Sequence, residues 1–268
     1  PPYTQKQKQK HREQSMQNFK QLHHAANPIL IGNVWDARSA ICAQQTGYLA
    51  LGTSSAAIAN SLGYEDGENM PFEELLFIVK RIKASSQLPL SVDLEAGYSQ
   101  NPEVIADHIQ QLAKLGVVGI NLEDSRVLAT RTLVSVEEFS TILLEARRHL
   151  VERRVDIFIN VRCDAFLLGL DGAVEEAKAR AKAYESAGAD GLFFPCARRE
   201  EDIAELVAAT SLPVNLMSMP ELPNFDVLAC LSVKRISTGN FAHEVIYGQL
   251  EQTLLKIKDE GCCAPLFT

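Results

Sequence analysis

Short apolar runs alternate with longer segments of helical period along the chain from Pro28 onward. The apolar runs end in polar or glycine residues, and the longer segments repeat apolar residues every three to four positions. This alternation is typical of repeated strand–helix units. It predicts eight strands, at Ile29–Val34, Tyr48–Gly52, Leu90–Leu94, Val118–Glu123, Ile157–Arg162, Gly191–Phe194, Val214–Met217 and Arg235–Ser237.

Helices are expected between these strands and after the last one. Glycines just past several helix ends mark the turn into the next strand, as at Gly47, Gly116 and Gly188. Eight such units in about 240 residues match a (β/α)8 barrel, which typically has ~250 residues. The expected helices are Ala37–Thr46, Ser55–Ser61, Phe72–Ser86, Pro102–Leu115, Val136–Glu152, Gly172–Ala187, Glu200–Thr210, Asn224–Ala229 and Ala242–Glu260.

One alternative architecture is a doubly wound open sheet, in which strands and helices also alternate. Its dinucleotide-binding members carry a G-x-G-x-x-G turn after the first strand, whereas Ile29–Val34 runs into Trp35 and Asp36. We therefore predict an α/β fold of the TIM-barrel type. Residues 16–268 are expected to form this single domain, and the polar, Gln/Lys-rich residues 1–15 a mobile arm.

Composition and charge narrow the set of partners. The 268 residues are 46% hydrophobic and 22% charged, with a net charge of −8. No basic stripe is interleaved with aromatic residues, so a small-molecule substrate fits better than nucleic acid or an anionic membrane surface. Six cysteines without a C-x-x-C pair indicate neither a zinc site nor a disulfide framework. Without eighteen consecutive apolar residues or a signal-like start, the protein is expected to be soluble and cytoplasmic.

Carboxylates gather at the ends of two predicted strands. Because side chains alternate along a strand, Asp93 and Glu95 should share one face, and so should Asn121 and Glu123. If the strands are neighbours, three acids converge where barrel enzymes place their chemistry. Such acids repel unless a hard cation neutralises them, which predicts Mg²⁺, with Mn²⁺ as the alternative ion. Pairing with lysines or helix capping is the plainer interpretation, but the polar Ser91 on the inward face favours a site.

Two further segments carry candidate residues. Ser54 and Ser55 lie where a strand enters a short helix, so hydroxyls and free N–H groups can bind carboxylate or phosphate oxygens. Helix capping is an equal alternative there. Asp66, in a glycine-punctuated acidic loop, either belongs to a solvated turn or reaches the metal's water shell and acts as an acid or base.

A strand-end arginine offers the opposite charge. Arg162 is expected at the barrel mouth, where its guanidinium either grips a substrate carboxylate in bidentate fashion or only neutralises the acids. Asn121 and Asn215 are expected to line the same pocket. His243 is expected to be structural, and a thiolate nucleophile is not expected, because neither Cys163 nor Cys196 has a nearby histidine.

Taken together, several segments resemble the isocitrate lyase / phosphoenolpyruvate mutase superfamily. The resemblance runs from Pro28 to about residue 250, and six motifs occur in order with matching spacing. The motifs are Gly32-Asn33-Val34-Trp35-Asp36-Ala37-Arg38-Ser39-Ala40, Thr53-Ser54-Ser55, Leu62-Gly63-Tyr64-Glu65-Asp66-Gly67, Val92-Asp93-Leu94-Glu95-Ala96-Gly97-Tyr98, Asn121-Leu122-Glu123-Asp124 and Val161-Arg162-Cys163-Asp164-Ala165-Phe166.

This resemblance implies a specific site. Mg²⁺ would be held directly by Asp93 and through waters by Asp66, Glu95 and Glu123. Further, Ser54, the Ser55 backbone and Arg162 would hold the carboxylate and carbonyl end of a 2-oxo acid or its enolate, with Asp66, Arg162 and Ser54 as the catalytic groups. It also implies a homo-oligomer, a dimer or tetramer, in which the last barrel helix packs on or is swapped with a neighbouring subunit.

The chain departs from the best-defined members of the superfamily. Isocitrate and methylisocitrate lyases carry a Lys-Lys-Cys-Gly-His loop after the fourth strand, whereas residues 124–133 here contain neither Cys nor His. Those lyases also place a Glu after a Pro at the end of strand six, but here Pro195 precedes Cys196. Residues 125–134 also lack the Lys and Asn of the mutase loop, and we expect them to form a gate in which Arg126 or Arg131 touches substrate.

We therefore predict a Mg²⁺-dependent lyase or hydrolase. It would cleave a C–C or P–C bond next to the carbonyl of a small 2-oxo or 2-hydroxy carboxylate through an enolate. Three alternatives stay open: mutase or phosphonopyruvate hydrolase-like activity, an aldolase of another metal-dependent barrel family, and a non-catalytic binding protein for 2-oxo acids.

Overall fold

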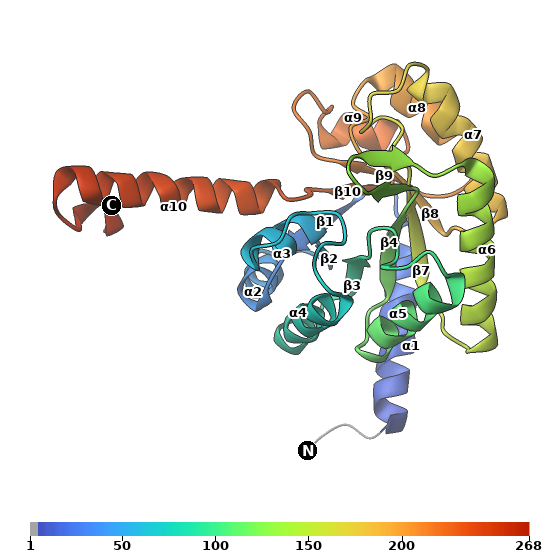
Figure 1. The fold of residues 1–268 in the computed structure, drawn as a ribbon, viewed down its shortest axis with the longest axis horizontal. Helices are drawn as coiled ribbons and strands as arrows, with labels where there is room; N and C mark the ends of the chain where they lie inside the picture. Colours follow the sequence, from blue (N-terminus) through green and yellow to red (C-terminus); the bar gives the residue numbers. More distant parts are fainter. Residues whose placement is uncertain (1–4, 268) are drawn as a thin grey trace.

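The computed structural model describes the backbone of residues 5–267 and the side chains of residues 13–267. Eight parallel strands close into a barrel in the order β1-β10-β9-β8-β7-β4-β3-β2, with helices outside it (Figure 1). The predicted TIM-barrel fold is confirmed, and each predicted strand agrees to within two residues at either end. The barrel strands are β1 (Ile29–Val34), β2 (Ala50–Thr53), β3 (Leu90–Asp93), β4 (Gly119–Glu123), β7 (Phe158–Arg162), β8 (Gly191–Phe194), β9 (Val214–Met217) and β10 (Arg235–Ser237).

The helices also follow the sequence pattern closely. Local signals fix their ends: Asn101 and Ser135 cap two of them through side-chain oxygens that accept backbone N–H groups. The helices are α1 (Gln5–Leu22), α2 (Ala37–Gln45), α3 (Ser55–Ser61), α4 (Phe72–Ser85), α5 (Pro102–Lys114), α6 (Val136–Glu152), α7 (Ala173–Ser186), α8 (Glu200–Ala208), α9 (Phe225–Cys230) and α10 (Phe241–Glu260), followed by a short 3₁₀ turn at Ala264–Leu266.

Helix α1 closes the N-terminal end of the barrel. The Phe19 ring is fully buried and meets the ring of Phe158 edge-on at 5.6 Å, at the start of β7. The ring of His23 stacks on the same phenylalanine at 4.4 Å, and burial lowers the pKa of His23 to about 3. Gly119 leaves the space that Phe19 fills, since a Cβ there would lie 2.9 Å from the ring. The sequence pattern had not predicted this helix.

The expected boundary between residues 15 and 16 falls inside α1, whose Met16 belongs to the core. A division between an arm and the barrel therefore has no counterpart in the secondary structure at that point. The mobility of residues 1–15 and the single-domain organisation of residues 16–268 stay predictions.

The barrel interior is polar through its middle. Ser91, Asn160 and Asn215 are all buried, and the Arg235 guanidinium reaches across to 3.5 Å from both Ser91 Oγ and Asn121 Oδ1. Burial lowers the pKa of Arg235 to about 10. Because polar groups are costly to bury without partners, such an interior is typical of a barrel whose open end carries a site.

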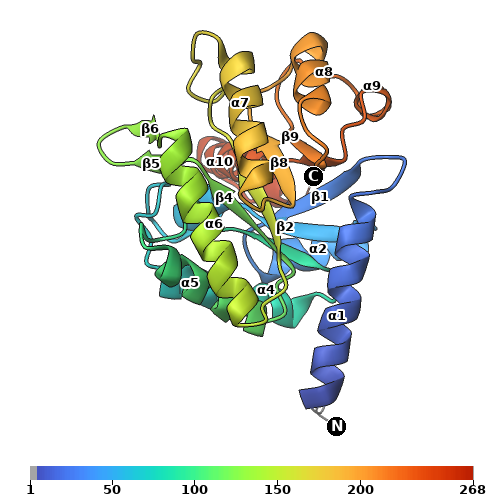
Figure 2. The ribbon, with the colours of Figure 1, turned by 90° about the vertical axis from the view of Figure 1, so that its right-hand side faces the viewer.

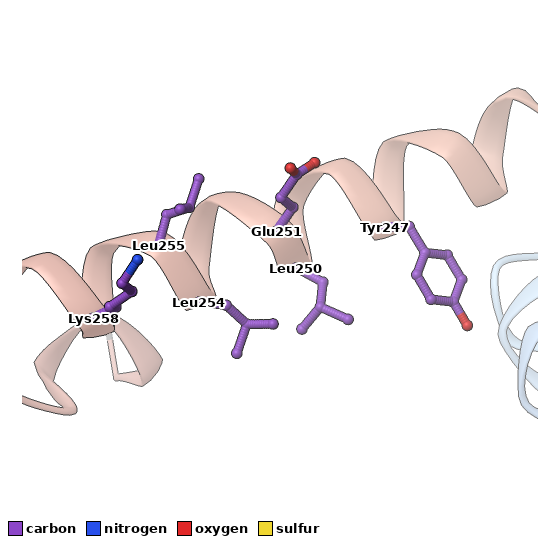
Figure 3. Close-up of a pocket in the computed structure, with 6 residues that line it drawn as sticks. All are labelled: Tyr247, Leu250, Glu251, Leu254, Leu255 and Lys258. Carbon is purple, nitrogen blue, oxygen red and sulfur yellow. The ribbon is translucent and has the colours of Figure 1, made fainter.

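Helix α10 leaves the barrel and projects far from it (Figure 1). Tyr247, Leu250 and Leu254 point to one side of this helix and Leu255 to another (Figure 3). All four side chains are exposed, and so is Phe267 in the segment after the helix. A helix in this position cannot bury its apolar face against its own barrel. None of the helices in the described part of the chain is long and apolar enough to cross a membrane.

Replacing Phe19 with alanine tests the role of α1. The substitution should lower the free energy of unfolding by about 3–5 kcal/mol, because it leaves a cavity between α1 and the barrel floor. Urea denaturation followed by circular dichroism measures this. Phe77→Ala on α4, where the side chain is 60% exposed, is the matched control and should change stability by only about 0.5 kcal/mol. Equal effects of the two substitutions would contradict a closing role for α1.

Candidate active site

Asp93 lies at the end of β3 and has one carboxylate oxygen to spare. Its backbone N–H donates to Thr53 Oγ1 at 2.8 Å, and Ser55 Oγ donates to Asp93 Oδ2 at 2.8 Å. The other oxygen, Oδ1, is buried and has no hydrogen-bond partner among the described residues. Buried carboxylate oxygens normally have a partner, so an unpaired one is a candidate ligand for a cation.

Glu95 joins Asp93 by a route that the sequence did not predict. Strand β3 ends at Asp93, and Glu95 adopts a left-handed backbone with φ of 52°. The expectation that strand alternation places the two acids on one face is therefore wrong, because the turn aims Glu95. Its carboxylate is 3% exposed and accepts the Glu68 N–H at 2.8 Å and the Tyr98 hydroxyl at 3.2 Å.

The acids raise one another's proton affinity. Burial, followed by the charges of Asp66, Asp93 and Glu123, raises the pKa of Glu95 to about 9. Burial also raises the pKa of Glu123 to about 8, although Arg162 and Arg131 act in the opposite direction. The pKa of Asp66 is raised by burial and by Asp93. A bound cation would stabilise the ionised form of these carboxylates and so lower their pKa values.

The donor set fits a cation that one carboxylate binds directly. Among the described residues, no group of three or more His, Cys, Asp or Glu side chains is placed to hold a metal ion. The converging acids therefore do not form a set of direct ligands. The unpaired Asp93 oxygen can bind an ion, while Glu95 and Glu123 lie close enough to lower its energy through charge.

Arg162 lies at the mouth as expected, but its guanidinium is already engaged. Its Nε and Nη2 donate to the two oxygens of Asp164 at 2.6 and 3.2 Å. Its Nη1 lies 2.9 Å from Glu123 Oε2. The bidentate grip expected for a substrate carboxylate is thus made to Asp164, a buried acid that the sequence analysis did not single out. Its position two residues after Arg162 was the available signal.

Residues expected to form a gate fold as a β-hairpin of β5 (Ser125–Val127) and β6 (Arg131–Leu133). Figure 2 shows this hairpin standing beyond the end of β4. Arg126 pairs with Glu138 of α6 at 2.8 Å, whereas Arg131 turns inward. Arg131 Nη1 donates to Glu123, to Ser125 Oγ at 2.8 Å and to Asp164 Oδ2 at 3.2 Å. Of the two arginines left open by the sequence, the structure brings Arg131 to the acids.

Asp124 anchors the base of the hairpin. Its Oδ2 accepts from Tyr184 at 2.7 Å and from Arg180 at 3.0 Å, and its Oδ1 accepts the Asp164 N–H at 2.9 Å. The side chain is fully buried. Asp124 is therefore a structural anchor of the hairpin.

The remaining expected site residues fall into two groups. Ser54 caps α3 by accepting the Ala57 N–H at 3.3 Å, as the capping interpretation requires, so anion binding there stays a prediction. Asn121 Oδ1 accepts from Asn160 at 2.9 Å, and Asn215 is buried with its Nδ2 unpaired. Both asparagines belong to the polar interior below the mouth.

The other nucleophile and base candidates stay outside the chemistry. His243 is buried, with Nε2 3.0 Å from Ser61 Oγ and its ring against Trp35. Burial raises the pKa of Cys163 well above that of a free thiol and also raises that of Cys196. Thiols with raised pKa values are poor nucleophiles, and the absence of a thiolate nucleophile stays a prediction.

Buried carboxylates at the C-terminal end of a (β/α)8 barrel are typical of metal-assisted barrel enzymes. A family model described as phosphoenolpyruvate phosphomutase matches residues 19–258. The chain belongs to this family, and thus to the isocitrate lyase / phosphoenolpyruvate mutase superfamily. Its relatives include a 2-methylisocitrate lyase of Shewanella oneidensis, and a phosphonopyruvate hydrolase that shares the fold was solved in complex with oxalate and Mg²⁺.

Individual relatives agree with this assignment. An uncharacterized protein of Mycobacterium tuberculosis is 34% identical over 83% of this chain and 82% of the relative. An oxaloacetate decarboxylase of Bradyrhizobium sp. is 30% identical over 80% of this chain and 74% of the relative. The crystal structure of a proposed phosphonomutase from Burkholderia cenocepacia is 38% identical, with a TM-score of 0.85 over 90% of this chain and 99% of the other.

The raised pKa of Glu95 makes stability depend on pH. Between its ordinary pKa of 4.5 and about 9, the folded protein binds more protons at Glu95 than the unfolded chain does. Stability should therefore decline as pH rises through this window when no divalent metal is present. Thermal melts between pH 5 and 9 should show a shallower decline for Glu95→Gln than for wild type. Glu73→Gln, at an exposed position on α4, should keep the wild-type slope; identical slopes for all three proteins would contradict the assignment.

Proposed function

We propose that this protein is a Mg²⁺-dependent lyase or hydrolase acting on a small 2-oxo or 2-hydroxy carboxylate through an enolate. The observation that carries the proposal is the unpaired, buried Asp93 Oδ1 among mutually repelling acids at the barrel mouth. Family membership and the oxaloacetate decarboxylase relative support the substrate class. Mn²⁺ is the alternative ion, since oxygen ligands also suit it.

In this proposal Asp93 holds the ion, with Asp66, Glu95 and Glu123 around it. When bound, the ion would supply a Lewis acid that stabilises negative charge on the substrate's carbonyl oxygen. Arg162 stays ionised, since Glu123 and Asp164 raise its pKa despite burial, so it adds a fixed positive charge beside that oxygen. The Ser54 hydroxyl and the Ser55 backbone N–H, with Asn121 and Asn215 below, would orient the carboxylate end of the substrate.

Asp66 is the proposed acid or base. It lies on a loop at the mouth with its side chain 42% exposed, and its pKa is raised above the ordinary value by burial and by Asp93. A carboxyl group with a raised pKa can hold a proton closer to neutral pH and then release it to a leaving group. The loop cysteine and strand-six glutamate of the lyases are absent, so Asp66 is the group we assign to proton transfer.

The same absences favour a second candidate, a binding protein for 2-oxo acids that keeps the metal site without turnover. Mutase or phosphonopyruvate hydrolase-like activity is the other alternative. Metal-dependent ligand binding is common to all of them, and product formation separates the enzymes from the binding protein.

We also propose that the protein is a cytoplasmic homo-oligomer, a dimer or tetramer, assembled through α10. The exposed stripe of Tyr247, Leu250 and Leu254 supports this, because a second copy can bury it. All six cysteines are free, which suits a reducing compartment.

Oxalate, which mimics the enolate of pyruvate, tests the metal site. Wild-type protein should bind oxalate in calorimetry only when Mg²⁺ is present, and Asp93→Asn should lower the affinity for the pair by about 100-fold or more, because removing a charged ligand weakens the ion's hold. Asp107→Asn on α5, which loses a surface ion pair to Arg153 at the end of α6, is the matched control and should bind like wild type. Metal-independent oxalate binding by wild type would contradict the proposed site.

Turnover is tested by following pyruvate release from a series of 2-oxo diacids and phosphonates. Asp66→Asn should lower kcat about 100-fold or more on an active substrate, since proton transfer by a positioned group contributes ~10²–10⁴-fold. Oxalate binding with Mg²⁺ should stay within about threefold of wild type, because Asp66 lies outside direct contact with the ion. Unchanged kcat in the variant would remove Asp66 from the mechanism, and no product from any compound with intact oxalate binding would favour the binding protein.

A further inference from the structure

The two arginines at the mouth are engaged in different ways. The Nε and Nη2 groups of Arg162 form one edge of its guanidinium and donate to the two oxygens of Asp164, while its Nη1 forms an ion pair with Glu123. That edge is the one that grips a carboxylate in bidentate fashion. Arg162 can therefore attract a bound anion by its charge, but its Nε and Nη2 donors are already bonded to Asp164 and cannot bind a ligand carboxylate.

Arg131 keeps the same edge free. All of its hydrogen bonds to described residues run through Nη1, to Glu123, Ser125 and Asp164. Its Nη2 has only a loose ion pair, 3.8 Å from Asp66 Oδ2, and its Nε donates to no described side chain or backbone oxygen. The side chain is 18% exposed. A guanidinium has five N–H donors in a rigid planar arrangement, so the donors on Nε and Nη2 of Arg131 are available to a ligand.

The hairpin that carries Arg131 is fixed at both ends. At its base the Val134 N–H donates to Asp124 O at 2.8 Å, and Arg180 Nη1 donates to Val134 O at 2.9 Å. Near its tip Val127 packs so closely on Gly67 that a Cβ on the glycine would lie 2.7 Å from Val127 Cγ2. A two-stranded hairpin alone is marginally stable, but these contacts hold Arg131 in place before any ligand binds.

The partner of the free edge is one that a ligand can replace. Asp66 approaches Nη2 only to 3.8 Å, and its side chain is 42% exposed, so this ion pair is loose and a ligand can displace it. A carboxylate arriving from solvent can form two short, charge-assisted hydrogen bonds with Nε and Nη2. Without such a cation the surrounding acids would repel any ligand with a second negative charge.

We propose that Arg131 is a specificity-determining residue that binds a second, distal carboxylate of the substrate through its Nε and Nη2 edge. The inference rests on the proposed function and narrows its substrate class to small dicarboxylates. One carboxylate and the adjacent oxygen face Asp93 and its cation, and the other carboxylate takes the place of Asp66 on Arg131. Arg126, on the same hairpin, takes no part, because its Nη1 is paired with Glu138 of α6.

The test compares three probes by calorimetry in the presence of Mg²⁺. Oxalate occupies the metal end alone, whereas malate and lactate are 2-hydroxy acids that differ in the distal carboxylate. Wild type should bind malate at least about tenfold more tightly than lactate. Arg131→Gln should lower malate affinity about 10- to 100-fold, the range for losing hydrogen bonds to a charged group, and leave oxalate and lactate within about twofold.

Two further variants make the result specific. Arg126→Gln is the matched control on the same hairpin and should bind all three probes like wild type. Arg131→Lys keeps the charge beside Glu123 and Asp164 but lacks the planar fork, so it should recover only part of the malate affinity while oxalate stays unchanged.

Distinct outcomes separate this inference from the function on which it rests. If Arg131→Gln and Arg131→Lys weaken oxalate as much as malate, Arg131 only neutralises the acids and the inference fails. It also fails if wild type binds oxalate with Mg²⁺ but does not distinguish malate from lactate. If wild type binds no oxalate with Mg²⁺, the proposed function itself is wrong.

Discussion

Negative charge packed into the C-terminal end of the barrel is the constraint on which the rest of the site depends. Asp93, Glu95 and Glu123 come from neighbouring strands or the turn after one, and burial together with mutual repulsion raises the pKa of Glu95 to about 9. Protein cations relieve part of this energy through the ion pairs of Arg162 and Arg131. The repulsion that remains is one that a bound divalent ion would relieve.

The scaffold supplies that charge through three neighbouring strands with a common pattern. Strands β3, β4 and β7 each present a neutral polar residue inside the barrel and a titratable residue two positions later at the mouth. Asn160 donates to Asn121 on the neighbouring strand, and Arg235 reaches across the barrel to Ser91. The apolar floor made by Phe19 of α1 lies on the opposite end. The position of a residue along its strand therefore determines whether its side chain packs in the floor, hydrogen-bonds inside the barrel or lies at the mouth.

The hairpin after β4 gives the mouth its individual character. At this point the chain places an arginine, Arg131, on a short, anchored hairpin. Asp124 contributes to the architecture and not to the chemistry, since Arg180 and Tyr184 hold its carboxylate below the hairpin. Because Asp164 fills the fork of Arg162, the two arginines are not equivalent. Arg162 donates to Asp164 from Nε and Nη2, whereas Arg131 donates to protein atoms from Nη1.

The sequence by itself determined the barrel and most of the acids. Alternation of apolar runs with helical segments is a local signal, and it placed the strands, the helices and the mouth positions of Asp93, Glu123 and Arg162. Only the tertiary structure decided the rest, because it depends on contacts between distant segments. The left-handed turn at Glu95, the packing of α1 under the barrel and the unequal arginines have no local period. A side chain's free hydrogen-bonding edge is known only once its neighbours are in place.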